Sequence, residues 1–529
     1  MKNQEESISG SVLGATPNNF SRRQVLAGAG LVGAVAPLSS IFGADLANAA
    51  PRAGGTMRLG VPFGAASTND PHISPPGTQD VIRNFNVFNL LYWYNPDGSA
   101  LPMLASSCES NATATIWTLK LKSGVTFHDG SALTVDDVIF SLKRIADPKT
   151  VAEGRTAIGM IDTDNLKKVN DLTLTIPLKF AYSTLPYQFA TKGISILKNG
   201  TTSFTVPNGT GAFKFISGDA QKVVLGRNPN AWQGSGRPYI DKLEIIKVAD
   251  AAARLNGLKS GALDTIYPTT SADVTAVKSD RKIKVFTSTT GTIMPLLVNC
   301  AVKPFNDPNV RLAMKLAADR TMMNKVSYDR KGIIGNDMFG IFDSGYPALP
   351  QRQYDPEKAA GLWKKAGLVG KRFELLTADI WPSQVAHSVT YAQRAARAKI
   401  DIDVVKIPAD QYFSKGYGVG GFHNEYWVYR PVLSLWNECF NLTSGDYKYT
   451  SWSSDANTKL FKAASAEGDP KKRDDITKEM MTNFYDDGPY ITWAHEASTN
   501  LYGPRVRGQE NNPVRGLNGF DFSGFYLTN

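Results

Sequence analysis

The amino-acid sequence predicts an α/β protein with more than one domain. Its 529 residues exceed what one hydrophobic core usually serves, so two or three domains are expected. Apolar residues make up 42% and charged residues 20% of the chain, which is typical of an ordered globular protein. The clearest local sign of the class is a strand–helix–strand alternation at residues 373–377, 382–399 and 400–407.

The N-terminal segment resembles a twin-arginine export signal. Ser21-Arg22-Arg23 precedes a weakly apolar run at residues 27–42, and Ala47-Asn48-Ala49 is a small-x-small cleavage pattern. The apolar run has about 16 residues and is shorter than the roughly 20 that a membrane span needs. We expect cleavage after Ala49, with no cysteine nearby to carry a lipid, and a soluble product in the periplasm.

The expected mature chain begins with a strand at residues 54–61, because a glycine pair leads into an alternating apolar run. A loop rich in Ser, Asn, Asp and Pro follows at residues 65–76. Farther on, Thr134 is predicted to cap a helix that runs to Arg144. Asp355 with Pro356 is predicted to start another helix, which ends at Gly367.

The strand–helix–strand unit also predicts where a ligand would lie. Ligands of parallel sheets collect at the carboxyl ends of the strands, which places residues 377–381 at such an edge. Trp381 is therefore a candidate binding residue.

Several motifs resemble one protein family. They are Pro102-Met103-Leu104-Ala105, Trp117-Thr118-Leu119-Lys120-Leu121, Gly124-Val125-Thr126-Phe127-His128-Asp129-Gly130, Thr134-Val135-Asp136-Asp137-Val138, Gly209-Thr210-Gly211-Ala212-Phe213, Asn228-Pro229-Asn230-Ala231-Trp232 and Val310-Arg311-Leu312-Ala313. Their order strongly resembles that of the extracellular solute-binding proteins that serve peptide, nickel and opine ABC importers. The resemblance covers nearly the whole mature chain.

The resemblance implies a two-lobed, type II-like periplasmic binding protein fold with an additional inserted domain and hinge strands. We expect residues 1–49 as signal peptide, 50–82 with 204–295 and 493–529 as lobe I, 83–203 as the inserted domain and 296–492 as lobe II. The hinge is expected near residues 294–299 and 490–493. Closure of the lobes would bury a small-molecule ligand, which is then delivered to the permease subunits of an ABC importer. A monomer without cofactor or catalysis is expected.

One position bears on the ligand. In oligopeptide-binding relatives a Trp is followed three residues later by an Asp that pairs with the peptide's ammonium group. The apparent counterpart here is Trp427 followed by Arg430. The reversed charge would favour a carboxylate, which an arginine can bind with two hydrogen bonds. The alternative for Arg430 is a salt bridge with another side chain.

The other candidate ligand-binding residues are aromatic or small and polar. Tyr429 and Trp436 lie near Arg430 in the sequence, as does Trp427, and Trp381 follows the strand at residues 373–377. Each of these aromatic residues is expected either in the pocket or in a hydrophobic core. Ser67 and Asn69, with Thr68 between them, would donate hydrogen bonds from the loop after the first strand, or form a turn there.

Other classes of protein fit the sequence less well. The net charge of +10 is spread along the chain without a basic run, so no nucleic-acid partner is expected. An exported metallo- or redox enzyme would need clustered ligands, but the five histidines are dispersed and the three cysteines form no CxxC. No dinucleotide, P-loop or nucleophile-elbow motif occurs in a strand-to-helix context. The pair His128-Asp129 has no nucleophile beside it and is expected to be structural.

Two alternatives stay open within the binding class. A short peptide would need a carboxylate in the pocket, for which Glu425 and Glu438 are near. A nickel or other metal chelate would need a histidine, and only His423 lies near. Cys108, Cys300 and Cys439 form either one disulfide and one buried thiol or three buried thiols.

Overall fold

The computed structural model describes residues 51, 53–62, 68–73, 78–234, 236–409, 411–416, 418–441 and 449–528. Residues 51–529 form one compact unit. The predicted signal peptide lies outside the described residues, as does Ser67. None of the helices in the described ranges has both the length and the apolar character of a membrane span.

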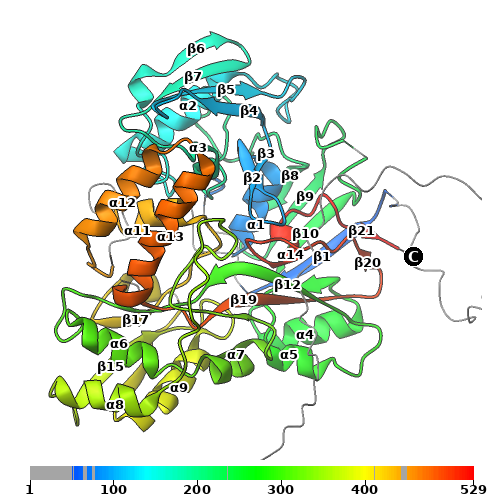
Figure 1. Ribbon diagram of the computed structural model, residues 1–529. Helices are drawn as coiled ribbons and strands as arrows, with labels where there is room; N and C mark the ends of the chain where they lie inside the picture. The colour runs from blue at the N-terminus through cyan, green and yellow to red at the C-terminus, as the bar shows by residue number, and fades with distance from the viewer. Residues whose placement is uncertain are drawn as a thin grey trace, which may run out of the picture. The chain divides into compact units, whose positions relative to one another are not determined.

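The largest sheet has eight strands among the described residues, and it joins distant parts of the chain (Figure 1). Its order is β12 (Lys284–Ile293), β19 (Ala494–Tyr502), β11 (Thr265–Ile266), β1 (Thr56–Val61), β10 (Lys242–Lys247), β9 (Lys222–Arg227) and β8 (Phe213–Gly218), with β14 (Ile333–Ile334) paired to β19. β1 runs parallel to β10 and β11, and the other pairs are antiparallel. The predicted first strand is confirmed as β1, whose Met57, Leu59 and Val61 are fully buried.

A four-stranded antiparallel sheet is built from the segment predicted as the inserted domain. Its order is β4 (Ala105–Ser110), β5 (Ile116–Leu121), β7 (Thr173–Pro177) and β6 (Lys167–Asn170), with the hairpin β2 (Tyr92–Tyr94) and β3 (Ala100–Pro102) beside it. The alternating sequence of β5 puts Trp117, Leu119 and Leu121 in the core. The predicted helix that follows is confirmed as α2 (Val135–Ala146), where the Thr134 amide donates to Asp137 Oδ2 at 2.7 Å.

The third large sheet has five strands. Its order is β16 (Asp401–Lys406), β15 (Arg372–Thr377), β17 (Phe422–Asn424), β13 (Leu296–Val298) and β18 (Tyr490–Ile491). β15 and β16 pair in parallel and α9 (Gln384–Ala395) connects them, so the predicted strand–helix–strand unit is confirmed. The helix predicted after Asp355 is confirmed as α8 (Pro356–Lys365), whose Lys358 amide donates to the Asp355 carboxylate at 2.8 Å.

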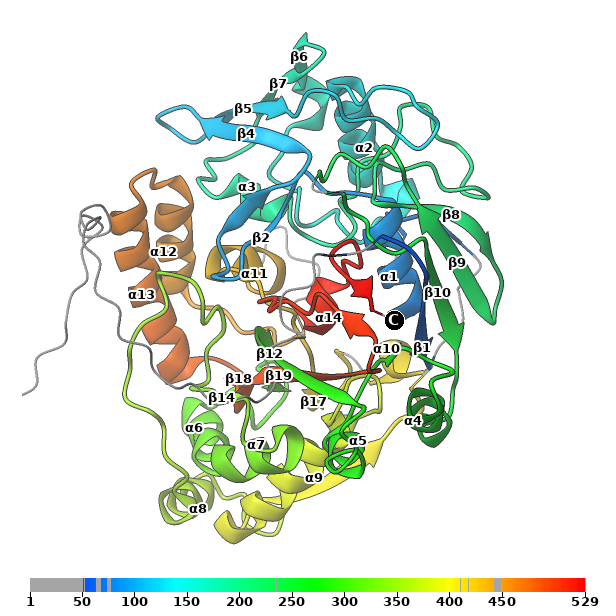
Figure 2. The ribbon, with the colours of Figure 1, turned by 90° about the vertical axis from the view of Figure 1, so that its right-hand side faces the viewer.

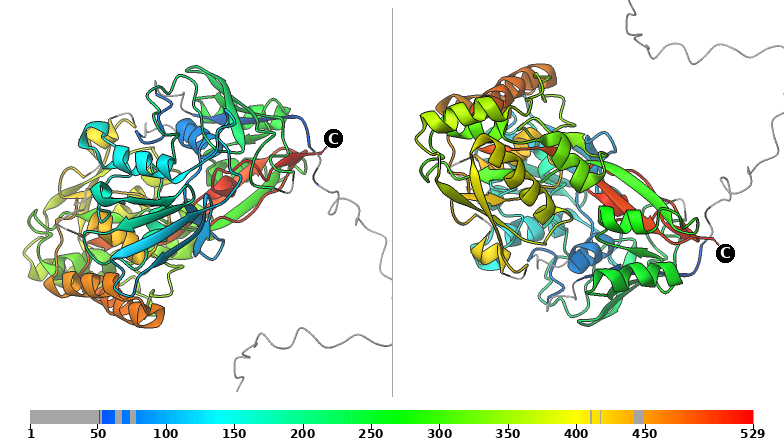
Figure 3. Two further views of the ribbon diagram at one scale, coloured as in Figure 1. Left: turned by 90° about the horizontal axis from the view of Figure 1, so that it is seen from above. Right: turned by 90° about the horizontal axis from the view of Figure 1, so that it is seen from below.

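The remaining helices cover these sheets (Figures 1 and 3). They are α1 (Thr78–Val87), α3 (Leu185–Gln188), α4 (Ala251–Ser260), α5 (Ser271–Ala276), α6 (Pro308–Leu316), α7 (Arg320–Tyr328), α10 (Tyr412–Lys415), α11 (Val432–Cys439), α12 (Asp455–Ala466), α13 (Pro470–Asp487) and α14 (Gly516–Gly519), with short 3-10 turns at Pro148–Thr150, Thr163–Asn165 and Ala396–Ala398 and a terminal pair of strands, β20 (Val506–Arg507) and β21 (Tyr526–Leu527). Figure 3 shows α12 and α13 packed side by side at one edge.

Two short crossings of the chain join the eight- and five-stranded sheets, besides the longer connections on either side of β14. Met294 and Pro295 connect β12 to β13, and Thr492 and Trp493 connect β18 to β19. The indole of Trp493 donates to the Met294 carbonyl at 2.8 Å, so the two crossings are hydrogen-bonded to each other. These positions lie within the segments expected to form a hinge. The exact domain boundaries stay predictions, although each sheet draws its strands from one predicted region, β14 excepted.

Candidate ligand-binding site

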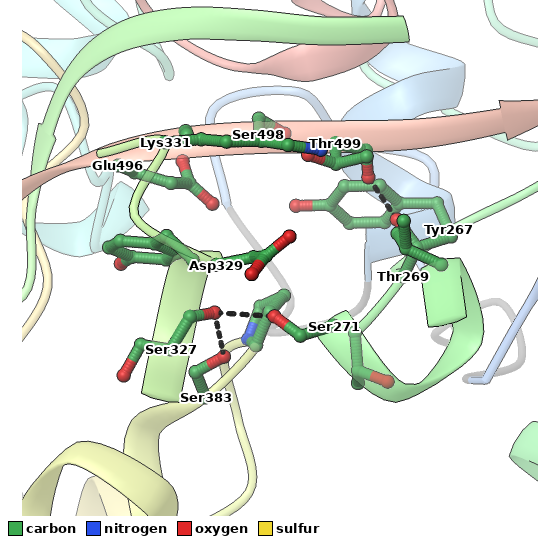
Figure 4. A pocket seen from close by; sticks show the side chains of 15 residues that line it. Tyr267, Thr269, Ser271, Ser327, Asp329, Lys331, Ser383, Glu496, Ser498 and Thr499 are labelled. Atoms are coloured by element: carbon green, nitrogen blue, oxygen red, sulfur yellow. Dashed lines mark hydrogen bonds between the residues drawn. The ribbon is translucent and has the colours of Figure 1, made fainter. Parts of the chain in front are cut away.

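A pocket of about 500 Å³, partly open to solvent, lies where residues of the two predicted lobes meet (Figure 4). One wall comes from the segment after β11 and from β19, and the opposite wall from the end of α7 and the loop before α9. The lining residues are Tyr267, Thr269, Thr270, Ser271, Val274, Ser327, Tyr328, Asp329, Lys331, Pro382, Ser383, Glu496, Ala497, Ser498 and Thr499.

Hydroxyl groups dominate this lining, and some of them fasten the two walls together. The hydroxyls of Ser271 and Ser383 donate to the Ser327 carbonyl at 3.0 and 2.9 Å. Asp329 and Lys331 are exposed at the mouth, whereas Glu496 is buried. The pocket is therefore polar, with charged groups of both signs at its mouth.

Glu496 connects the pocket to Trp381, the aromatic candidate from the loop after β15. The Trp381 indole donates to Glu496 Oε1 at 3.1 Å, and the Thr290 hydroxyl donates to Oε2 at 3.4 Å. Trp381 stacks on Tyr426 with ring centroids 4.8 Å apart. Burial raises the pKa of Glu496 to about 7, because desolvation disfavours its charged form.

Arg515, which the sequence-based reasoning missed, lies close behind these residues. Its side chain is 7% exposed, and its guanidinium carbon lies 5.0 Å from the ring centroid of Phe520 and 5.8 Å from that of Phe85. Phe520 in turn packs edge-on against Tyr267. Burial lowers the pKa of Arg515, and the charges or phenols of Tyr267, Tyr426, Glu496 and Glu153 oppose that shift. No local motif distinguishes Arg515 from the other basic residues of the sequence.

Arg430 forms a salt bridge with Glu438 of α11, and both side chains are largely buried. Its guanidinium also lies 5.4 Å from the Trp427 ring. The two residues that the sequence offered separately, as partners of a carboxylate and of an ammonium group, thus neutralise each other. A role of Arg430 in ligand binding stays a prediction.

Two of the aromatic candidates take part in dense packing. Tyr429 contacts Tyr94 and Phe342, with ring centroids 5.5 and 5.3 Å apart. Trp436 belongs to an aromatic cluster with Phe440, Trp452 and Phe484. Both side chains are buried in a hydrophobic core, the alternative expected for aromatic residues in this segment.

The loop candidates and the histidine–aspartate pair hold backbone segments in place. Asn69 donates its amide to the Phe204 carbonyl at 3.0 Å, and Thr68 accepts from the Asp70 amide. A ring nitrogen of His128 hydrogen-bonds the Gly211 carbonyl at 3.0 Å, and Asp129 accepts from the Ser131 backbone and from Lys198. These contacts fit the expectation that His128 and Asp129 have a structural role.

Within the described ranges, no group of three or more His, Cys, Asp or Glu side chains is arranged to hold a metal ion. His423 is buried and packs near Tyr449. Cys108, Cys300 and Cys439 are all free thiols, so the alternative with a disulfide is wrong; of the three only Cys439 is buried, whereas Cys108 and Cys300 are half-buried.

Comparison with known proteins gives a consistent result. A family model described as "Bacterial extracellular solute-binding proteins, family 5 Middle" matches residues 100–438. The glutathione-binding protein GsiB of Pectobacterium atrosepticum is 25% identical over 360 residues, which are 65% of this chain and 67% of that protein.

Solved structures show the same fold. The periplasmic binding protein DppA of Helicobacter pylori, in complex with the peptide STSA, matches 90% of this chain and 99% of its own at a TM-score of 0.78 and 21% identity. AgaA of A. tumefaciens R10, in complex with agropinic acid, matches 90% of this chain and 99% of its own at a TM-score of 0.77 and 23% identity. The predicted two-lobed α/β fold is thereby confirmed.

Proposed function

Because the chain belongs to the bacterial extracellular solute-binding proteins of family 5, we propose that it is the periplasmic binding component of an ABC importer. It captures a small organic solute, such as a peptide, an opine-like compound or another carboxylate-bearing molecule, and delivers it to the membrane permease. The names of GsiB, DppA and AgaA, which bind glutathione, a peptide and agropinic acid, support this range of ligands. The protein acts as a monomer and without catalysis, after export by the twin-arginine pathway.

The observation that carries this proposal is the pocket between two walls from different sheets, beside the two crossings of the chain. Rotation about the crossings would separate Ser271 from Ser327 and Trp381 from Glu496, which now hydrogen-bond across the interface. A ligand that contacts both walls binds the closed state better than the open one, and this difference in affinity drives closure. Release to the importer then requires only that the permease favours the open state.

A thermal-shift screen tests the proposal. Purified mature protein is heated with pools of peptides, opines, amino-acid derivatives, sugars, polyamines and metal chelates. We expect at least one pool to raise the melting temperature, because a ligand that binds only the folded form stabilises it. Small-angle scattering with the selected solute should show a smaller radius of gyration. No stabilisation by any pool, or steady turnover of an added solute, contradicts the proposed function.

A further inference from the structure

Arg515 differs from the other buried cationic side chains of the described ranges in having no hydrogen-bonding partner. Arg83 pairs with Asp80, Arg320 with Asp337 and Arg311 with Asp487, whereas Arg254 and Lys315 donate to backbone carbonyls. Among the described residues, no acceptor hydrogen-bonds the guanidinium of Arg515, and its Nε atom is fully buried without a hydrogen bond. A buried charge without a partner is costly, so such a group calls for an explanation.

The surroundings of Arg515 hold the guanidinium in place without satisfying its donors. The rings of Phe520 and Phe85 lie on it at 5.0 and 5.8 Å, in the geometry of cation–π contacts. These two residues come from opposite ends of the expected mature chain, one in α1 and one directly after α14. Figure 2 shows α14, which Arg515 precedes, beside β12 and β19 near the crossings. The arginine is therefore positioned in advance and keeps its N–H groups available.

Arg515 also belongs to the environment of the pocket. Tyr267 and Glu496 line the pocket, and both interact electrostatically with Arg515. Figure 4 shows the Tyr267 hydroxyl and the Glu496 carboxyl turned toward the same space. Arg515 is not itself among the lining residues. It lies behind Tyr267, whose ring contacts the Phe520 ring that carries the guanidinium, so a ligand that reaches past Tyr267 approaches the guanidinium.

The nearby acids leave the positive charge incompletely balanced. Glu153 is held by Lys192 at 2.9 Å and contributes no net negative charge with that partner. Glu496 has a pKa of about 7, so a substantial part of it is neutral at physiological pH. An arriving anion therefore finds a site of net positive charge in surroundings that exclude water, where ionic attraction is strong.

We propose that Arg515 pairs with a carboxylate of the bound solute, through the planar, two-pronged hydrogen bonding that a guanidinium gives to this group. The assignment rests on the proposed function and names the class of ligand that the site selects, a carboxylic acid. Arg430 is less suited to this task, because its charge is already matched by Glu438. Tyr267, which lines the pocket, and Tyr426, which stacks on Trp381, both interact electrostatically with Arg515.

Calorimetry with matched acid and amide probes tests the assignment. The probes are glutathione, trialanine and octopine, each measured beside its carboxamide derivative, with wild-type protein and with Arg515→Met, Arg515→Lys and Arg430→Met. Arg507→Met is the control for the loss of one positive charge, because among the described residues Arg507 donates only to the nearby carbonyls of Pro504 and Val506.

We expect wild-type protein to bind at least one acid and to prefer it to its amide. Arg515→Met should weaken binding of the acid by about 30-fold or more and abolish the preference over the amide, as expected when one partner of a buried charge pair is removed. Arg515→Lys should recover part of the loss, and Arg430→Met and Arg507→Met should keep the preference. The melting temperature of ligand-free Arg515→Met should not fall, since no ion pair is broken and removal of the unpaired buried charge offsets the loss of the two cation–π contacts.

Several outcomes contradict the assignment. They are an unchanged acid preference in Arg515→Met, loss of that preference in Arg430→Met instead, or a lower melting temperature of ligand-free Arg515→Met, which indicates a structural role. Wild-type protein that binds only solutes without a carboxylate would also overturn it, while leaving the solute-binding function intact. Failure of wild-type protein to bind any solute in the broader screen would instead contradict the proposed function itself.

Discussion

Glu496 illustrates how one buried side chain can link stability to pH. The residue is 3% exposed, and its carboxyl group accepts hydrogen bonds from Trp381 and Thr290. Because burial raises its pKa to about 7, the folded protein holds a proton that the unfolded chain releases above pH 4.5. Glu496 therefore lowers the stability of the folded state as the pH rises from 4.5 to 7, and its effect is constant above that range.

Replacement of Glu496 by glutamine should remove this contribution while preserving an acceptor for Trp381. Between pH 5 and pH 8, the free energy of unfolding of wild-type protein should fall relative to that of Glu496→Gln by about 2–3 kcal/mol. Urea unfolding at the two pH values measures the difference. Parallel pH profiles of the two proteins would show that Glu496 ionises normally.

The individual site residues differ in how far the sequence alone can identify them. Trp381 could be predicted because it follows a strand in a recognisable strand–helix–strand unit, and it does lie beside the pocket through its bond to Glu496. Arg430 could be singled out only by analogy, and its partner Glu438 was not predictable as such because their pairing depends on how α11 is packed. Arg515 carries no sequence signal, since its burial arises from Phe85 and Phe520, which lie far apart in the chain.

At the scale of elements, local chemistry determined what was predictable. The strand at β1 and the helices α2 and α8 follow from alternation, capping residues and proline, all of which act within a few residues. The two-residue strands β11, β14 and β18 exist only because a neighbouring strand pairs with them, so no local pattern reveals them. Likewise, no local sequence pattern reveals the short connections between the sheets.

Gly335, next to β14, is a test of how tightly the second crossing is packed. A Cβ atom there would lie 2.4 Å from the Thr492 carbonyl oxygen and 2.9 Å from the Ala494 nitrogen, both backbone atoms. Gly335→Ala should therefore lower the free energy of unfolding by about 1–3 kcal/mol. Urea denaturation measures this, and an unchanged midpoint would show that the crossing yields easily.

Gly361 provides the matched control for that substitution. It lies inside α8, and a Cβ atom there would meet nothing within 4 Å. Alanine is favoured over glycine in a helix, so Gly361→Ala should raise the free energy of unfolding by about 0.5–1 kcal/mol. The two alanine variants should thus shift the urea midpoint in opposite directions.

At the scale of the whole molecule, the five histidines add up to a large pH dependence of the stability. All five are buried, or nearly so, and desolvation lowers the pKa of each to about 4. The folded protein keeps them neutral while the unfolded chain protonates them below pH 6.5. Their contribution to stability is complete above pH 6.5 and is lost as the pH falls toward 4.

Unfolding near pH 5.3 should therefore take up roughly four protons, five by the histidines less the one that Glu496 releases. Calorimetric unfolding in two buffers with different ionisation enthalpies measures this number. An uptake of one proton or fewer would contradict the buried, neutral state of the histidines.

The free thiols allow a further prediction for the entire chain. Cys108, Cys300 and Cys439 should all react with a thiol reagent in denaturant without prior reduction. The melting temperature should be the same with and without a reducing agent. A single reactive thiol per chain would reveal a disulfide bond and contradict this arrangement.

The domain arrangement was predictable at this scale only through resemblance to a family. Seven strands of the eight-stranded sheet, β1, β8 to β12 and β19, come from the regions expected as lobe I, and the five-stranded sheet comes from residues 296–491, where β14 of the eight-stranded sheet also lies. Composition and periodicity alone reveal no such partition. It depends on pairing between strands more than 200 residues apart, such as β11 with β19 and β1 with β11, which no local rule can foresee.

The position of β19 has a consequence for biosynthesis. This strand lies between β12 and β11 in the sheet and follows both of them in the chain. All strands of the five-stranded sheet precede β19 in the chain, whereas β12, at the edge of the eight-stranded sheet, stays separated from β11 and the rest of that sheet until β19 has been synthesised. A polypeptide interrupted before residue 494 would thus retain unpaired strand edges, a natural target for chaperones and proteases.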